Sequence, residues 1–211
     1  MRYLILFIIP FMSLTAYTTT ELSASPKVVL LEKFLSEAEC NYLIQGAVPQ
    51  LMRSRVFTAK GEQLDHRRTS KGMFYPSLSS DPVLTAVENR VARLVELPRE
   101  NGEGIQVLWY QEGGEYQPHF DYFDPKIPGG VDRGGQRVVT VIMYLNNVEE
   151  GGETIFPKLD IAVSPVKGNA LLFYNCTPDG REDPRTLHGG APVKKGEKWI
   201  ANKWIRLERF H

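Results

Sequence analysis

The chain has 211 residues, and its 25 lysines and arginines balance 25 aspartates and glutamates, so its formal net charge is zero. This balance gives no electrostatic reason to expect nucleic acid or an anionic membrane as a partner, and the length favours a single domain. Only two cysteines are present, Cys40 and Cys176. We predict that they are separate, mostly buried thiols rather than a disulfide.

The first 25 residues are organised like a secretory leader. Arg2 precedes an apolar run over 3–14, which only Pro10 and Ser13 interrupt, and a tract rich in threonine and serine follows. Because the run is shorter than the ~20 residues of a typical membrane-spanning helix, we interpret 1–25 as a signal peptide, with an uncleaved anchor as the alternative. A buried N-terminal strand or helix is a third reading, which the polar tract disfavours.

This interpretation sets both the location and the domain boundary. A leader would send the chain into a secretory route, meaning the endoplasmic reticulum lumen, the periplasm or the cell exterior. Only an uncleaved anchor would attach it to a membrane. The folded domain is then expected over 26–211.

Two helices are expected in the first half of that domain. Ser36 and Glu39 have the spacing of a capping box, and the helix that they begin should end near residues 46–49. Asp81 and Pro82 are typical of the N-cap and first position of a second helix. Residues 53–75 mix charges, glycine and β-formers, which predicts a hairpin or loop rather than a core element.

From residue 104 onward the pattern changes to short strands. We expect strands over 105–110, 116–122, 138–145, 153–156, 161–163, 170–174, 187–188 and 199–207. Two helices followed by about eight strands predict an α+β fold, a sandwich or open barrel with the helices packed on one sheet. Residues 123–136 contain four glycines and two prolines, which is typical of a long loop that rims a site.

A pair of candidate metal ligands precedes this loop. His119 and Asp121 are two residues apart on a predicted strand, so their side chains would face the same way. A histidine nitrogen and a carboxylate oxygen are two thirds of the facial triad that binds Fe(II). His66 lies in a charged segment and His211 ends the chain, whereas His188 is bracketed by predicted strands and followed by two glycines. We therefore predict His188 as the third ligand.

Lys198 points to a second ligand of the same site. It begins an aromatic, apolar strand ten residues after His188. A buried ammonium there needs an anionic partner, whereas the neutral Tyr110 and Thr154 could only donate hydrogen bonds to that anion. A dicarboxylate that chelates iron at one end and contacts Lys198 at the other meets both needs, which indicates 2-oxoglutarate.

Three segments of the chain resemble the prolyl 4-hydroxylases among the Fe(II)/2-oxoglutarate dioxygenases. They are YQEGGEYQPHFDYF over 110–123, YLNNVEEGGETIFP over 144–157 and LHGGAPVKKGEKWIANKWI over 187–205. The resemblance covers most of 27–210 and implies a double-stranded β-helix, a distorted jelly roll. It also implies the iron ligands His119, Asp121 and His188. Lys198 would bind the distal carboxylate of 2-oxoglutarate, helped by Tyr110 and Thr154.

The same resemblance implies a peptide groove. Positions lining that groove in the family are matched by Tyr116, Arg137 and Trp204. A mobile hairpin that closes over the peptide is matched by Arg68 and Ser70. Arg206 departs from the pattern, because several relatives carry a histidine there, and a different peptide preference is therefore expected.

The implied activity is 4-hydroxylation of proline in a proline-rich or collagen-like peptide. It would use Fe(II), dioxygen and 2-oxoglutarate, release succinate and carbon dioxide, and need ascorbate to rescue oxidised iron. A lysine at 198, where lysyl hydroxylases and nucleic-acid demethylases have an arginine, resembles the prolyl hydroxylase branch. One alternative is a related oxygenase that acts on another amino acid or a small molecule. Another is a non-catalytic jelly-roll binding module, which would take up no iron and tolerate Lys198→Ala.

Overall fold

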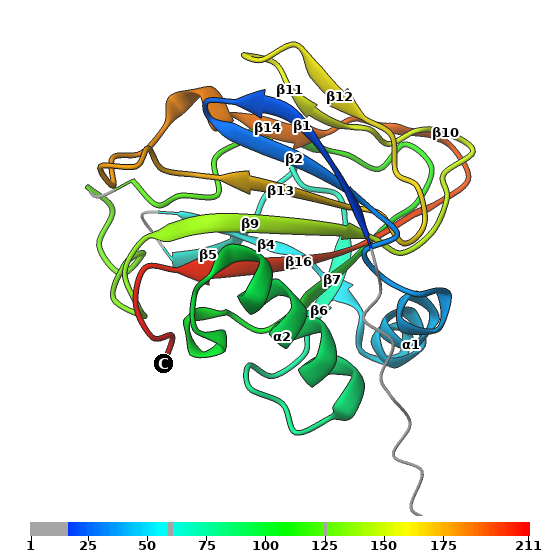
Figure 1. Cartoon of the computed structure of the whole chain (residues 1–211). Helices are drawn as coiled ribbons and strands as arrows, with labels where there is room; N and C mark the ends of the chain where they lie inside the picture. Colours follow the sequence, from blue (N-terminus) through cyan, green and yellow to red (C-terminus); the bar gives the residue numbers. More distant parts are fainter. Residues whose placement is uncertain (1–16, 59–60, 125) are drawn as a thin grey trace, which may run out of the picture.

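The computed structural model describes residues 17–211 except 59–60 and 125 (Figure 1). Its helices are α1 (Glu37–Ala47) and α2 (Pro82–Val95), with the short 3-10 segments η1 (Val48–Gln50), η2 (Arg99–Asn101) and η3 (Pro184–Thr186). The strands are β1 (Thr18–Ala24), β2 (Lys27–Glu32), β3 (Met52–Arg53), β4 (Arg55–Thr58), β5 (Gly61–Leu64), β6 (Lys71–Phe74), β7 (Gln106–Tyr110), β8 (Tyr116–His119), β9 (Arg137–Tyr144), β10 (Glu150–Gly151), β11 (Thr154–Phe156), β12 (Ile161–Val163), β13 (Ala170–Tyr174), β14 (His188–Gly190), β15 (Val193–Lys195) and β16 (Lys198–Arg206).

Most strands form a large and a small antiparallel sheet, while β10 pairs with β15 and β4 with β5 in two-stranded sheets. The large sheet has the order β1-β2-β13-β9-β16-β7-β6-β3, and the small sheet has the order β12-β11-β14-β8. In Figure 1 both helices lie on one side of the large sheet, while β11, β12 and β14 lie on the other side. This arrangement confirms the predicted α+β sandwich with helices packed on one sheet.

The central strands alternate between two cores because successive side chains on a strand point to opposite faces. On β9, Val141 and Met143 belong to the core that α1 and α2 cover. Ile142 and Tyr144 belong to the core between the two sheets, where they join Phe156 of the small sheet. The space between the sheets is therefore lined by every second residue of the central strands.

Both helices begin as predicted. The Ser36 hydroxyl accepts a hydrogen bond from the Glu39 backbone N–H, and the Glu39 carboxylate accepts one from the Ser36 N–H at 2.8 Å. Asp81 accepts hydrogen bonds from the second and third backbone N–H groups of α2, and Pro82 is its first residue. Glu39 also pairs with Arg90 of α2 at 2.8 Å, which ties the two helices together.

Part of the segment that we predicted as a leader is folded in the structure. Residues 18–24, assigned to the leader, form β1, which pairs with β2 at the edge of the large sheet. Threonine favours strands, and a polar edge strand can face solvent, so a threonine-rich tract suits this place. The apolar run over 3–14 lies outside the described residues, and the leader remains a prediction. No helix in the part of the chain that the structure describes is long and apolar enough to cross a membrane.

Residues 53–75 combine a hairpin with sheet strands. The hairpin prediction is confirmed by β4 and β5, which pair with each other. The prediction that this segment stays out of the core is wrong, because β6 pairs with β7 inside the large sheet and Met73 is buried. The many polar residues of this segment concealed the buried apolar side chains of Val56 and Met73. Cys40 and Cys176 are separate free thiols, as predicted.

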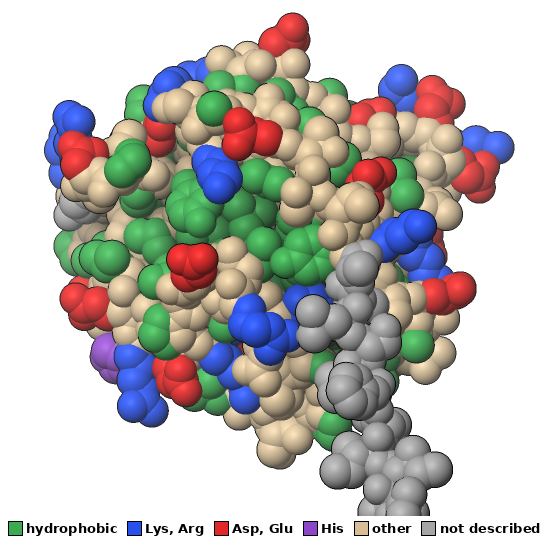
Figure 2. Space-filling model, viewed as in Figure 1, with side chains coloured by type: hydrophobic (Ala, Val, Ile, Leu, Met, Phe, Trp, Pro, Cys, Tyr) green, Lys and Arg blue, Asp and Glu red, His purple; other side chains and the backbone are tan. Residues whose placement is uncertain are grey.

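The face shown in Figure 2 mixes both signs of charge. Acidic and basic side chains surround hydrophobic side chains that gather over β9 and β13, beside the helices. This mixture agrees with a net charge of zero. The face carries no extended field of one sign.

A buried ion pair joins α2 to β16. Lys203 and Glu88 are each 1% exposed and lie 2.6 Å apart, and Glu88 also accepts a hydrogen bond from Arg99. We expect Glu88→Ala to lower the free energy of unfolding by about 3–5 kcal/mol, because it leaves a buried ammonium without its counterion. Glu37→Ala removes an ion pair with Lys167 in which the Glu37 side chain is 79% exposed. This change should lower the free energy of unfolding by at most about 1 kcal/mol. Urea unfolding measures both, and equal losses would contradict the expectation.

Candidate active site

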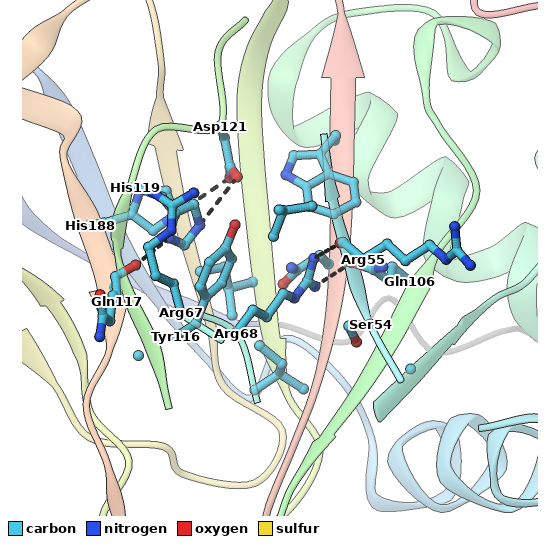
Figure 3. A pocket seen from close by; sticks show the side chains of 18 of the residues that line it. Ser54, Arg55, Arg67, Arg68, Gln106, Tyr116, Gln117, His119, Asp121 and His188 are labelled. Carbon is cyan, nitrogen blue, oxygen red and sulfur yellow. Dashed lines mark hydrogen bonds and ion pairs between the residues drawn. The ribbon is translucent and has the colours of Figure 1, made fainter. Parts of the chain in front are cut away.

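Neighbouring strands of the small sheet bring His119, Asp121 and His188 together. Strand β8 ends at His119, which pairs directly with His188 at the start of β14. Asp121 lies 3.7 Å from His119 and 3.6 Å from His188, measured between its carboxylate oxygens and the two Nε2 atoms. Figure 3 shows the three side chains pointing toward one another, and one ligand atom from each lies within 4.8 Å of the others. The predicted cluster is therefore present.

Both imidazoles are oriented by backbone carbonyls. His119 Nδ1 lies 2.9 Å from the Gln117 carbonyl oxygen, and His188 Nδ1 lies 3.0 Å from that of Thr186. Because a carbonyl can only accept, each Nδ1 carries the proton and each Nε2 lone pair faces the cluster. Burial lowers the pKa of His119 to about 3 and keeps this ring neutral.

Asp121 completes the donor set with a negative charge. Burial opposes ionisation of its carboxyl group, but the pairing with His188 and His119, the guanidinium of Arg137 and a hydrogen bond from Trp204 outweigh this and lower its pKa. Two neutral nitrogens and one carboxylate on one side of a point suit a divalent cation such as Fe(II). The residues present therefore fit the implied metal.

Asp121 lies just beyond the strand that we predicted to carry it. The prediction placed it on a strand over 116–122, but β8 ends at His119. Its Oδ2 accepts a hydrogen bond of 2.8 Å from the Thr140 hydroxyl, which in turn accepts one of 2.9 Å from the Asn175 amide. A hydrogen-bonded chain from β9 thus aims the carboxylate, and both of its members were missed in the sequence.

Removing the Thr140 hydroxyl should loosen metal binding. We expect Thr140→Val to weaken iron affinity by about tenfold, because an outer hydrogen bond that orients a ligand carboxylate is lost. The change should also cost about 1–3 kcal/mol of stability, since the buried Asn175 amide loses its acceptor. Iron titration and urea unfolding measure these effects. Thr140→Ser, which keeps the hydroxyl, should restore iron affinity, and failure to do so would exclude this role.

Lys198 is a buried cation with no anionic contact. It is 3% exposed on the inward face of β16, opposite Tyr110 of β7. Among the described residues its Nζ forms no hydrogen bond or ion pair, and its nearest aromatic contact is the Tyr110 ring at 5.8 Å. Burial lowers its pKa to about 8. A buried ammonium of this kind fits a carboxylate from a ligand.

Small and polar residues surround this ammonium. A Cβ atom on Gly190 would lie 3.6 Å from Lys198 Nζ, so the glycine keeps that side narrow and open. Tyr110 and Thr154 are buried beside it, as predicted. The Thr154 hydroxyl accepts a hydrogen bond of 2.8 Å from Tyr144, which fixes its orientation. Tyr144 was missed, because alternation marks it only as another core residue.

One cavity joins the metal cluster, Lys198 and the predicted groove residues. It has a volume of about 1140 Å³, and its lining includes Arg68, Tyr110, Tyr116, His119, Asp121, Arg137, Thr154, His188, Lys198 and Trp204. The Tyr116 ring stacks on His119 with centroids 3.6 Å apart, and the Arg68 guanidinium lies over Tyr116 at 4.9 Å. Arg137 stacks on Trp204 at 4.0 Å.

The predicted placement of Ser70 and Arg68 needs correction. Both lie in the connection between β5 and β6 rather than on the β4–β5 hairpin. Ser70 is fully buried, hydrogen-bonds with Ser54 and Arg68, and does not line the cavity. Arg68 is 6% exposed, and its Nη2 donates to Gln106 at 3.0 Å (Figure 3). Ser70 therefore supports Arg68, and its contact with a peptide stays a prediction.

Glu103 and Arg206 lie behind Arg137, which lines the cavity. Glu103 accepts hydrogen bonds of 2.6 Å from both Arg137 and Arg206. Arg206 also donates to the carbonyls of Gly130 and Gly135, at 2.8 and 2.7 Å, and so ties the 123–136 loop to the sheet. Glu103 was missed because a single acidic residue before a strand carries no signal, whereas Arg206 was noted only as a departure from the family pattern.

Two buried polar groups in the cavity wall remain available to a ligand. Asn202 Oδ1 and Trp204 Nε1 are buried without a hydrogen bond of ordinary length, counting partners among the described residues. Both residues line the cavity. Buried polar atoms are normally paired, so this wall suits a ligand with polar groups. Asn202 was not singled out in the sequence.

The chain is similar in sequence to known oxygenases. Residues 105–206 match the family model described as the 2OG-Fe(II) oxygenase superfamily. Probable prolyl 4-hydroxylase 4 of Arabidopsis thaliana is 42% identical over 213 residues, which span 90% of this chain and 70% of that protein. Prolyl 4-hydroxylase 2 of the same plant is 43% identical with the same coverage of 90% and 70%.

A solved structure agrees in fold. The viral collagen prolyl hydroxylase vCPH from Paramecium Bursaria Chlorella virus-1, in its 2OG complex, superimposes with a TM-score of 0.67 at 30% identity. The match covers 84% of this chain and 94% of that chain. The predicted resemblance and the jelly-roll fold are therefore confirmed. The chain belongs to the prolyl 4-hydroxylase family, within the 2OG-Fe(II) oxygenase superfamily.

Proposed function

We propose that this protein hydroxylates C4 of proline in proline-rich peptides, with Fe(II), dioxygen and 2-oxoglutarate. The observation that carries the proposal is the presence, in one cavity, of a nitrogen–oxygen–nitrogen cluster and a buried lysine without an anionic contact. A metal-free binding module would have no need for either feature. The membership of the prolyl 4-hydroxylase family supports the choice of proline over another amino acid or a small molecule.

Each part of the site has a distinct task. Iron chelated by 2-oxoglutarate supplies the oxidant that places one oxygen atom of dioxygen on a C–H bond, while the other leaves in succinate as carbon dioxide is released. His119, Asp121 and His188 would hold the metal from one side and leave its other side open. Lys198 would fix the distal carboxylate, with Tyr110 and Thr154 as hydrogen-bond partners. The cavity walls would position the proline and limit water access.

The peptide would lie across the aromatic and arginine-lined part of the cavity. Tyr116, Trp204 and Arg137 present flat surfaces there. Proline-rich segments are extended before they bind and lose few conformations, so a shallow groove of this kind suffices. Arg68 would contribute from the same wall, while Ser70 would act only through Arg68. A collagen-like peptide is one candidate substrate.

Two further properties belong to the proposal. Ascorbate would sustain turnover by returning oxidised iron to Fe(II), as the family resemblance implies. A secretory location would follow from the apolar run over 3–14 behind Arg2. Because β1 begins at Thr18 and pairs with β2, cleavage of a leader is expected before that residue.

The binding of 2-oxoglutarate should weaken at alkaline pH. Lys198 binds a carboxylate only as the ammonium, and burial lowers the pKa of the free form to about 8. Below pH 8 most Lys198 side chains are ammonium ions, and above pH 8 the ammonium fraction falls about tenfold with each pH unit. The KM for 2-oxoglutarate should therefore rise about tenfold from pH 7 to 9. The peptide KM should stay constant and serves as the internal control. A flat 2-oxoglutarate KM would contradict the role of Lys198.

A peptide panel tests the proposed function. The full chain, supplied with Fe(II), 2-oxoglutarate and ascorbate, is given proline-rich and collagen-like peptides and the same peptides with alanine for proline. We expect succinate release that depends on proline, and a gain of one oxygen atom that tandem mass spectrometry places on a proline ring. Chromatography against 4- and 3-hydroxyproline standards fixes the position. Hydroxylation of another residue type, or turnover without any hydroxyproline, would overturn the proposal.

A further inference from the structure

The outer part of the cavity carries an excess of positive charge in a protein whose net charge is zero. Among the described residues, five arginines line this cavity, namely Arg53, Arg55, Arg67, Arg68 and Arg137, whereas Asp124 is the only lining carboxylate besides the metal ligand Asp121. The iron ligands and Lys198 serve the metal and the co-substrate. The arginines are therefore available to the remaining occupant, the peptide.

Some of these charges are compensated within the protein. Arg67 pairs with Asp65 at 2.6 Å and adds no net charge. Arg137 and Arg206 share the single carboxylate of Glu103, so this group of three keeps one positive charge. Arg55 interacts with another group of the protein, so its charge is not part of this excess.

Arg68 is the most unusual of the remaining arginines. It is 6% exposed, yet the acceptors of its hydrogen bonds among the described residues are neutral, and include the Ser70 hydroxyl, the Arg55 carbonyl and the Gln106 amide oxygen. Its guanidinium lies over Tyr116, which stacks on the metal ligand His119. A buried cation is normally paired with an anion. Arg68 therefore places unmatched positive charge beside the reacting centre.

Arg53 extends this charge to the rim. It lies on β3, the edge strand of the large sheet, and its exposed side chain forms no ion pair with a described residue. Arg53, Arg68 and the Glu103 group together present three positive charges against the carboxylate of Asp124. The apolar side chains of Met52 and Phe74, which are 73% and 53% exposed, line the same end of the cavity. An extended peptide with both acidic and apolar groups matches this surface.

We propose that the peptide substrates of this protein carry acidic residues next to the target proline, recognised by Arg68 near the metal and by Arg53 at the rim. This inference rests on the proposed function and names its substrate class. Opposite charge across a groove raises the association rate and selects between otherwise similar partners. Because the groove opens to solvent at the rim, the contribution of Arg53 is screened by salt, whereas that of the buried Arg68 is screened less.

Three matched peptides test the proposal. They share one proline-rich sequence and differ only in carrying aspartate, asparagine or lysine on either side of the target proline. At low salt we expect kcat/KM for the aspartate peptide to exceed that for the lysine peptide by about tenfold, with the asparagine peptide between them. High salt should narrow this ratio. Equal kcat/KM for the three peptides, or a preference for lysine, would overturn the proposal.

A charge reversal at the rim localises the effect. Arg53→Glu should reduce the preference for aspartate over lysine by about fivefold. Arg93→Glu makes the same change of net charge on the exposed face of α2, outside the cavity, and should leave the preference as it was. If both variants shift the preference equally, net charge rather than the groove is responsible and the proposal fails.

The two proposals fail in different ways. If none of the three peptides gains oxygen on proline, the proposed function is at fault. If the asparagine peptide is hydroxylated and the charged peptides are equivalent to it, the function holds and only the acidic preference is lost.

Discussion

Replacing His188 with alanine is expected to abolish both iron retention and proline hydroxylation. His188 is 3% exposed, and its Nε2 faces Asp121 at 3.6 Å, with the ring orientation fixed by the Thr186 carbonyl. Even outer hydrogen bonds to metal ligands are worth 10- to 100-fold in affinity or activity, so loss of a direct ligand should cost more than about 100-fold. Iron bound per chain after gel filtration and hydroxyproline formed per minute measure the two effects. His119→Ala should behave in the same way.

His66→Ala is the matched control for this prediction. The His66 side chain is 91% exposed, and its Nδ1 lies 3.7 Å from an Asp65 carboxylate oxygen. Its replacement should change neither iron content nor activity. Hydroxylation that persists in His188→Ala without bound iron would exclude the iron-dependent mechanism, and a loss of iron in His66→Ala would point to a different metal site.

Replacing Lys198 with methionine is expected to raise the KM for 2-oxoglutarate by about 100-fold, since one partner of a buried charge pair is lost. The same change should stabilise the protein in the absence of ligand by about 1 kcal/mol or more, because a buried, uncompensated ammonium becomes an apolar side chain of similar length. Co-substrate kinetics and urea unfolding separate the two effects. Weaker binding combined with higher stability cannot come from misfolding, so the pair of results tests the role of Lys198 directly.

Lys203→Met, five residues further along the same strand, is the internal control. Lys203 is as well buried as Lys198, but it faces the helices and pairs with Glu88 at 2.6 Å. Its loss should therefore destabilise the protein, because Glu88 keeps only Arg99 as a partner. The KM for 2-oxoglutarate should not change. If the two substitutions gave the same pattern, a specific anion site at Lys198 would be excluded.

The metal and co-substrate residues were predictable because their chemistry is rare. His119 and Asp121 two residues apart, a distant His188 beside glycines, and a lysine opening an apolar strand each point to a ligand. The side chains of His119 and Asp121 lie close together although β8 ends at His119 and not at residue 122. Long-range contact, not strand geometry, turns Asp121 inward, since Thr140 donates to it across a separation of 19 residues.

The residues that support the site could not be predicted, because their roles also depend on long-range contacts. Thr140 and Tyr144 occupy inward positions on β9, and Asn175 directly follows β13. Alternation along a strand predicts burial at such positions and says nothing about hydrogen-bond partners. Glu103 meets Arg206 over a separation of 103 residues, which no local pattern encodes. Ser70 is buried because its segment contacts distant residues: the neighbouring Arg68 forms a β-bridge with Tyr116, and Ser70 itself hydrogen-bonds with Ser54. Local polarity alone made that segment look like a solvated hairpin.

The alternation along β16 restricts how this protein can change during evolution. The even-numbered side chains Lys198, Asn202 and Trp204 face the cavity, while Lys203 faces the helices. A point substitution can alter the co-substrate end or the peptide end of the strand independently. A single-residue insertion or deletion inside Lys198–Arg206 would exchange the two faces, since strand periodicity is two. New peptide preferences should therefore arise through substitutions in β16 and through changes of length in the 123–136 loop.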